Sequence, residues 1–123
     1  MTSSLLFPAR ILIADDLEGN REMLAELLRN EGYRVSLAED GEQALETLAT
    51  GPFDIVLLDV RMPHVTGFAA CRQIKSKLET QLLPVVLITG LDSTEDRIQG
   101  IECGADDFIS RPVKREELLA KVR

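Results

Sequence analysis

The feature that most constrains the fold of this chain is a fivefold alternation between short apolar runs and amphipathic stretches. The apolar runs predict strands near residues 10–14, 34–38, 54–58, 84–88 and 107–109, and the intervening stretches predict helices near 18–30, 41–50, 66–77, 93–103 and 114–123. Strands that alternate with helices form parallel sheets with right-handed crossovers. We therefore expect an α/β fold of (βα)5 type, with a doubly wound, flavodoxin-like five-stranded parallel sheet in the order 2-1-3-4-5.

Composition limits what such a chain can be. Its 123 residues, of which 45% are hydrophobic and 28% charged, fit one globular domain. A net charge of −7 would repel a phosphate backbone, so we expect no nucleic-acid binding by this domain. The longest apolar run, residues 82–88, is far shorter than the roughly 20 residues that span a bilayer, and no signal peptide is evident. We expect a cytoplasmic protein without membrane association.

Two cysteines, Cys71 and Cys103, fall within helical patterns. They lack the spacing of metal ligands, so we expect buried or half-buried free thiols. Gly32 and Gly104 follow two predicted helices, where a helix C-terminus favours glycine.

Acidic residues follow two of the apolar strands. Asp15 and Asp16 come after the first strand, and Asp59 comes after the third. Because parallel sheets bring the carboxyl ends of their strands to one edge, we expect these acids to meet there. Like charges that close require either a raised pKa or a bound cation. Thr89 and Arg111 follow the fourth and fifth strands at the same edge.

This set of side chains suits phosphate chemistry. Mg²⁺ takes one or two carboxylates and keeps waters or phosphate oxygens as its other ligands. An aspartate can also act as a nucleophile and form an aspartyl phosphate. A hydroxyl at Thr89 and a cation at Arg111 would then hold the phosphoryl oxygens.

Each residue also has a simpler explanation. Asp15 and Asp16 could cap the following helix, and Thr89 could satisfy a local backbone donor. Asp59 fits such an explanation least well, because it closes the apolar run Ile55 to Leu58, where a carboxylate is costly unless it is paired.

Four segments together resemble the receiver (response-regulator) domains of bacterial two-component signalling. They are ILIADD, DIVLLDVRMPHVTG, VVLITG and GADDFISRPV, which occur in the family's order and spacing. The resemblance covers Ala9 to Arg123 and leaves residues 1–8 as an N-terminal extension. It leaves open that the chain is one module of a longer protein.

The resemblance implies a phosphorelay switch. Asp59 would accept a phosphoryl group from a sensor histidine kinase or a phosphotransfer protein. Mg²⁺ or Mn²⁺ would be held by Asp16, Asp59 and the backbone carbonyl of Arg61, with Asp15 placing a water ligand. Such a domain promotes only its own phosphorylation and dephosphorylation, so we do not expect an enzyme that acts on other substrates.

The resemblance also implies a signalling surface. Thr89 would turn toward the phosphoryl group, and Phe108 would follow it inward. The face made by the fourth helix, fifth strand and fifth helix would then change its affinity for an output domain C-terminal to this segment, for a separate effector or for a second copy of the chain. The sequence is most similar to receivers that precede cyclic-di-nucleotide (GGDEF or HD-type) output domains.

Arg111 departs from the family, which usually has lysine before the proline. Arginine is longer, planar and always protonated, so the exchange is not conservative at a phosphate contact. Arg111 could pair with Asp59 and bias the unphosphorylated state, or a bidentate guanidinium could replace the lysine. The main competing hypothesis is therefore a pseudo-receiver that signals without phosphorylation. The family also implies a cis bond before Pro112.

Two further rivals share features of this chain. A flavodoxin-like nucleotide binder would need a Gly- or Ser/Thr-rich turn after the first strand, and that turn is acidic here. A dehalogenase-type phosphatase would need an acid at the position of Arg61. We expect the Arg61 side chain and His64 to be solvated loop residues.

Overall fold

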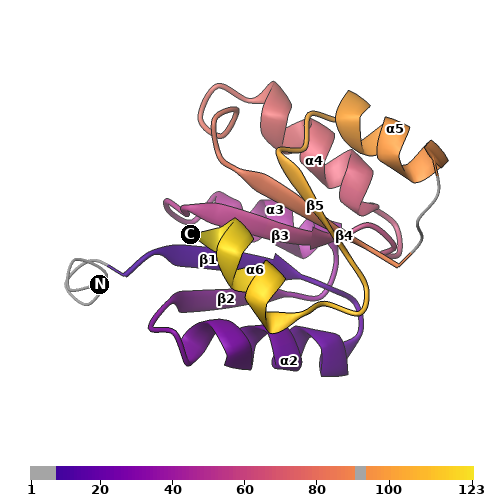
Figure 1. Ribbon diagram of the computed structural model, residues 1–123. Coiled ribbons are helices and arrows are strands. Elements are labelled where there is room, and N and C mark those ends of the chain that lie inside the picture. Colours follow the sequence, from indigo (N-terminus) through magenta and orange to yellow (C-terminus); the bar gives the residue numbers. More distant parts are fainter. Residues whose placement is uncertain (1–7, 91–93) are drawn as a thin grey trace.

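The computed structural model describes residues 8–90 and 94–123. Strands and helices alternate along the chain, as the sequence predicted (Figure 1). In order, they are β1 (Arg10–Ala14), α2 (Glu18–Arg29), β2 (Arg34–Ala38), α3 (Gly41–Leu48), β3 (Ile55–Asp59), α4 (Gly67–Ser76), β4 (Val85–Thr89), α5 (Thr94–Glu102), β5 (Asp107–Ser110) and α6 (Arg115–Val122). Of the predicted N-terminal extension, all but Pro8 lies outside the described residues.

The five strands form one parallel sheet in the order β2-β1-β3-β4-β5, which confirms the predicted doubly wound fold. Helices α2 and α6 cover one face, and helices α3, α4 and α5 cover the other (Figure 1). The chain steps outward from β1 to β2 and then returns to β3 on the other side of β1. Open α/β sheets bind ligands at the carboxyl ends of the strands at such a point.

The central strands are apolar because both of their faces are covered. Ile11 and Ile13 of β1 pack with α2 and α6, whereas Leu12 packs on the opposite side with α3 and α4. All residues of β3 and β4 are buried, and the edge strands β2 and β5 are partly exposed. The sheet is therefore a rigid support for residues at its ends.

Strands β3 and β4 start and end one residue later than predicted. Pro84 has no N–H to give to the ladder, so β4 starts at Val85, whose N–H donates to the Asp106 carboxylate at 2.8 Å. The shift makes Asp59 and Thr89 the last residues of their strands rather than the first residues after them. Their backbones are thus held in the sheet.

The helix ends follow the sequence signals. Gly32 and Gly104 adopt positive φ angles of 92° and 89° after α2 and α5, which confirms the predicted helix stops. Thr66 caps α4 by accepting the N–H of Ala69 at 3.1 Å. Among the described residues, no helix is long and apolar enough to cross a membrane.

Candidate functional site

Three carboxylates meet at the carboxyl ends of β1 and β3, as the sequence predicted. Asp15 and Asp16 follow β1, Asp59 ends β3, and one carboxylate oxygen from each lies within 4.8 Å of the others. Asp15 and Asp59 are buried, and Asp16 is exposed. Because β1 and β3 are paired neighbours, the topology alone brings these acids together.

Arg111 reaches the two buried acids from the loop after β5. Its Nη2 lies 2.8 Å from Oδ2 of Asp15 and 3.0 Å from Oδ1 of Asp59. The Arg111 side chain is 24% exposed, and those of Asp15 and Asp59 are 1% and 7% exposed. One guanidinium nitrogen therefore bridges two carboxylates that are shielded from water. The sequence raised the pairing with Asp59 as one of two outcomes and missed the pairing with Asp15. The Arg111–Pro112 bond is cis, as the resemblance implied.

The electrostatic balance at Asp59 favours additional positive charge. Burial raises the pKa of Asp59 above its ordinary value, and the Asp15 carboxylate raises it further. The hydrogen bond and charge of Arg111 oppose this rise without cancelling it, as does the Arg61 N–H, which lies 3.4 Å from Oδ1 of Asp59. The sequence allowed either a raised pKa or a cation, and the structure combines a raised pKa with an internal cation.

Asp15 is fixed by the turn that leads into α2. Its Oδ1 accepts the N–H of Leu17 at 2.9 Å, and its backbone oxygen accepts Nη1 of Arg21 at 2.8 Å. Leu17, the N-cap residue of α2, receives no side-chain cap, so neither Asp15 nor Asp16 caps this helix in the usual way. Sequence reasoning missed Arg21, whose only signal was its position in the second turn of the predicted helix.

The two predicted switch residues lie on neighbouring strands. Thr89 is buried at the end of β4, and Phe108 is half-buried on β5. Both line a cavity of about 360 Å³ that extends to α5 and α6. The Phe108 ring lies so close to Gly100 of α5 that a Cβ on Gly100 would overlap it. Packed residues thus connect the acidic edge with α5.

Gly67 is a site residue that sequence reasoning missed. A Cβ on Gly67 would overlap the backbone oxygen of Asp59, and the Gly67 N–H donates to the Val60 oxygen at 2.9 Å. The first turn of α4 can therefore approach the end of β3 this closely only with glycine. The available signal was a glycine directly after the helix-capping Thr66.

The loop between β3 and α4 carries Arg61 and His64. The Arg61 side chain is 65% exposed, with Nη2 3.8 Å from Oδ2 of Asp96 on α5. His64 is exposed, as predicted, and adopts a left-handed φ of 67°.

The donor set fits a hard divalent cation. All three side chains offer carboxylate oxygens, the ligands that Mg²⁺ prefers. Ligands on opposite sides of a Mg²⁺ ion lie about 4.2 Å apart, since each bond is about 2.1 Å long. Oxygens already within 4.8 Å of one another need only small side-chain movements to share such an ion.

A family model described as the response regulator receiver domain matches residues 11–123. The chain belongs to this family. It is 50% identical over 115 residues to the response regulator PleD of Caulobacter vibrioides, covering 94% of this chain and 25% of that protein. It is 43% identical over 116 residues to the response regulator MprA of Mycolicibacterium vanbaalenii, covering 94% of this chain and 49% of that protein. This receiver domain therefore spans between a quarter and a half of the length of these relatives.

Solved receiver domains share its fold. The receiver domain of a signal transduction histidine kinase from Syntrophus aciditrophicus has a TM-score of 0.88 at 35% identity, covering 93% of this chain and 86% of that one. The receiver domain of sensor histidine kinase PA1611 from Pseudomonas aeruginosa has a TM-score of 0.87 at 31% identity, covering 93% of both chains. The latter structure has a magnesium ion coordinated in its active site cleft.

Proposed function

We propose that this receiver domain accepts a phosphoryl group on Asp59 from the phosphohistidine of a sensor kinase or a phosphotransfer protein. The observation that carries the proposal is the position of Asp59, a buried carboxylate at the end of β3 beside two further acids and one guanidinium. Arg111 and the Arg61 N–H both contact Oδ1 of Asp59, so we assign Oδ2 as the attacking oxygen. It forms a bond to phosphorus while the phosphorus–nitrogen bond of the donor breaks.

The proposal includes Mg²⁺ or Mn²⁺ as cofactor. Asp16, Asp59 and the backbone carbonyl of Arg61 would hold the ion, and Asp15 would orient a water ligand. When bound, the ion supplies charge neutralisation for the transferring phosphoryl oxygens, which is most of what phosphoryl transfer requires. Asp16 is the exposed member of the acidic set and is the first side chain that an ion from solvent would meet.

Arg111 and Thr89 have a second task in this proposal. After transfer, the Arg111 guanidinium can contact the new phosphoryl oxygens instead of the carboxylate oxygens, because it already reaches Asp59. The Thr89 hydroxyl, one strand away on β4, would turn toward the same oxygens.

The pseudo-receiver alternative is less well supported. It would require Arg111 to prevent phosphorylation, yet Arg111 lies where a phosphoryl-binding cation is needed and all three acids are in place. The positions of Arg111 and of the three acids therefore favour a domain that can be phosphorylated on Asp59.

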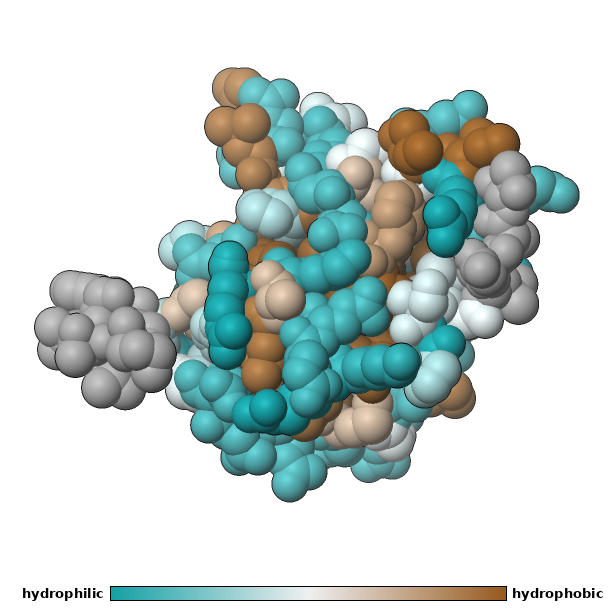
Figure 2. All heavy atoms as spheres, viewed as in Figure 1, coloured by the Kyte–Doolittle hydropathy of each residue, from teal (hydrophilic) through white to brown (hydrophobic). Residues whose placement is uncertain are grey.

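We propose α5, β5 and α6 as the output face. Phe108 links the Thr89 cavity to this face, and Ile98 and Ile101 of α5 are 49% and 69% exposed. Figure 2 shows hydrophobic residues over α5. An output domain, a separate effector or a second copy could cover them. The predicted preference for cyclic-di-nucleotide output domains is not confirmed, because the similar receivers include those of both PleD, at 50% identity, and MprA, at 43% identity.

The test is phosphorylation by a small phosphodonor with Mg²⁺, followed by intact mass spectrometry. We expect one phosphoryl adduct on the native chain and none on Asp59→Asn. The absence of an adduct under conditions that label an ordinary receiver would refute the proposal and favour the pseudo-receiver. Beryllofluoride, which mimics the phosphoryl group, should give Mg²⁺-dependent spectral changes in the native chain only.

A further inference from the structure

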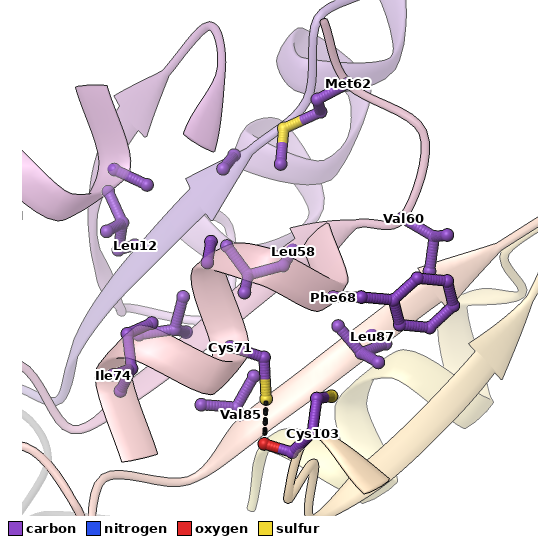
Figure 3. Packing of buried hydrophobic residues seen from close by; sticks show 14 of the residues in the cluster. Leu12, Leu58, Val60, Met62, Phe68, Cys71, Ile74, Val85, Leu87 and Cys103 are labelled. Carbon is purple, nitrogen blue, oxygen red and sulfur yellow. Dashed lines mark hydrogen bonds between the residues drawn. The ribbon is translucent and has the colours of Figure 1, made fainter. Parts of the chain in front are cut away.

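Two thiols that the proposed function does not use lie against each other in the core. Cys71 is on α4 and Cys103 directly follows α5, and the two residues are 0% and 3% exposed. The Cys71 thiol donates to the backbone oxygen of Cys103 at 3.4 Å (Figure 3). The Cys103 thiol donates to the Gly100 oxygen at 3.1 Å. Figure 3 shows both side chains beside α4, among buried core residues such as Val85 and Leu87. They belong to segments 32 residues apart in sequence.

The two thiols have unequal chemistry. The hydrogen bond from the Cys71 thiol to Cys103 lowers the pKa of Cys103 to about 7, although burial acts in the opposite direction. The same bond, together with burial, raises the pKa of Cys71. Cys103 is therefore the nucleophile of the pair and Cys71 its partner, because the thiolate is the reactive form of cysteine.

We propose that Cys71 and Cys103 form a reversible intramolecular disulfide when the domain meets a hydroperoxide, and that this bond ties α4 to α5. The consequence for signalling rests on the proposed function, whereas disulfide formation itself does not.

The reaction balances in two steps. The Cys103 thiolate attacks one oxygen of the hydroperoxide, the O–O bond breaks, and the departing oxygen takes a proton to leave as water or alcohol. The Cys103 sulfenic acid is then attacked by the Cys71 sulfur. A sulfur–sulfur bond forms, the sulfenic oxygen leaves with the Cys71 proton as water, and the hydroperoxide is the species reduced.

Burial selects the oxidant. Because the two cysteines are only 0% and 3% exposed, a bulky disulfide such as oxidised glutathione cannot reach them, whereas hydrogen peroxide is close to water in size. Cys103 is the more exposed of the two and lies at the C-terminal end of α5, where helices fray most readily. A small opening there is enough for the first step, and the second step needs only the existing contact.

The bond would act on the output face. Oxidation removes the Cys103 donor to Gly100, the residue that packs directly on Phe108. The disulfide also replaces a noncovalent contact between α4 and the end of α5 with a covalent bond. Any movement of α5 that follows phosphorylation would then be restricted from the end next to Phe108.

The test uses the native chain, reduced and then treated with hydrogen peroxide. After denaturation, remaining thiols are alkylated and counted by intact mass. We expect a monomer that has lost two hydrogens, takes no alkyl group and regains two alkylatable thiols on reduction. Cys71→Ser and Cys103→Ser are the matched controls. Cys71→Ser should stop at the sulfenic acid or overoxidise, and Cys103→Ser should react at least tenfold more slowly.

Other outcomes overturn the proposal. The native chain could retain both thiols, form intermolecular dimers, or gain oxygen without losing two hydrogens, and each of these results would contradict the proposal.

Circular dichroism before treatment checks that the variants fold. Asp59→Asn should form the disulfide at the native rate, which separates this test from that of the proposed function. If the oxidised native chain still responds to beryllofluoride as the reduced chain does, the disulfide stands and its effect on signalling is refuted.

Discussion

At the scale of single residues, the site depends on the substitution of arginine for the usual lysine. A lysine ammonium is a compact point charge, whereas the guanidinium is longer and planar. Here one guanidinium nitrogen serves Asp15 and Asp59 at 2.8 and 3.0 Å. Arg111 is therefore an internal counter-ion for a pair of acids that would otherwise repel each other. A divalent cation at the same oxygens would share that task with it.

Removal of Arg111 should destabilise the metal-free domain. Arg111→Gln leaves two buried carboxylates without their cation, and we expect a loss of about 2 kcal/mol in the free energy of unfolding. This is less than the roughly 3–5 kcal/mol of a fully buried pair, because Arg111 is 24% exposed. Urea unfolding in the presence of a chelator measures the loss, and Mg²⁺ should restore part of it.

Arg115→Gln is the matched control for this experiment. Arg115 pairs with Glu31 at 2.7 Å, but its side chain is 55% exposed, so we expect a change of at most about 0.5 kcal/mol. Equal losses in the two variants would mean that the Arg111 pairing contributes no more than a surface ion pair.

The raised pKa of Asp59 predicts a specific pH dependence. A carboxyl whose pKa is higher in the folded than in the unfolded state stabilises the fold at low pH, and that contribution is lost as the pH rises through the folded pKa. Asp59→Asn should therefore stabilise the metal-free domain at neutral pH. The gain should shrink as the pH falls toward 3.8, the ordinary value for Asp. Thermal unfolding at several pH values checks this, and a gain independent of pH would contradict it.

At the scale of elements, the sequence predicted the central strands β1, β3 and β4 well because their apolar runs are buried on both faces. The acids meet as predicted because β1 and β3 are neighbours in the 2-1-3-4-5 strand order of this sheet. The contacts of Arg21 and Gly67, and the bond from Arg111 to Asp15, could not be predicted in the same way. They depend on how closely one element approaches another, which periodicity does not encode.

Gly67 gives the approach of α4 to β3 a direct test. Gly67→Ala places a methyl group on the Asp59 carbonyl oxygen, so α4 must shift, and we expect a loss of about 1–3 kcal/mol together with slower phosphorylation. Gly19→Ala is the control, because a Cβ there meets nothing within 4 Å. In helix α2 that change should stabilise the domain by about 0.5–1 kcal/mol. Similar effects at both positions would show that close packing at Gly67 is unimportant.

At the scale of the whole molecule, the two helical layers differ in what they can transmit. Helices α2 and α6 pack in one apolar cluster, and α3, α4 and Cys103 at the end of α5 pack in the other. Thr89 and Phe108 line a cavity of about 360 Å³ that lies beside α5 and extends to α6. A cavity beside a proposed phosphorylation site gives Phe108 room to move without unfolding the sheet.

This asymmetry predicts where activation should be visible. With Mg²⁺ and beryllofluoride, amide hydrogen exchange should change in α5, β5 and the start of α6, and should stay within error in α3 and the central part of α2. In Asp59→Asn, beryllofluoride should leave amide hydrogen exchange unchanged in all of these elements. If activation also exposes Ile98 and Ile101 to a partner surface, sedimentation of the native chain should shift toward a dimer, and replacing Ile101 by Ser should abolish that shift while leaving the phosphoryl adduct intact. Exchange that changes evenly over both layers would contradict a switch confined to the α5 side.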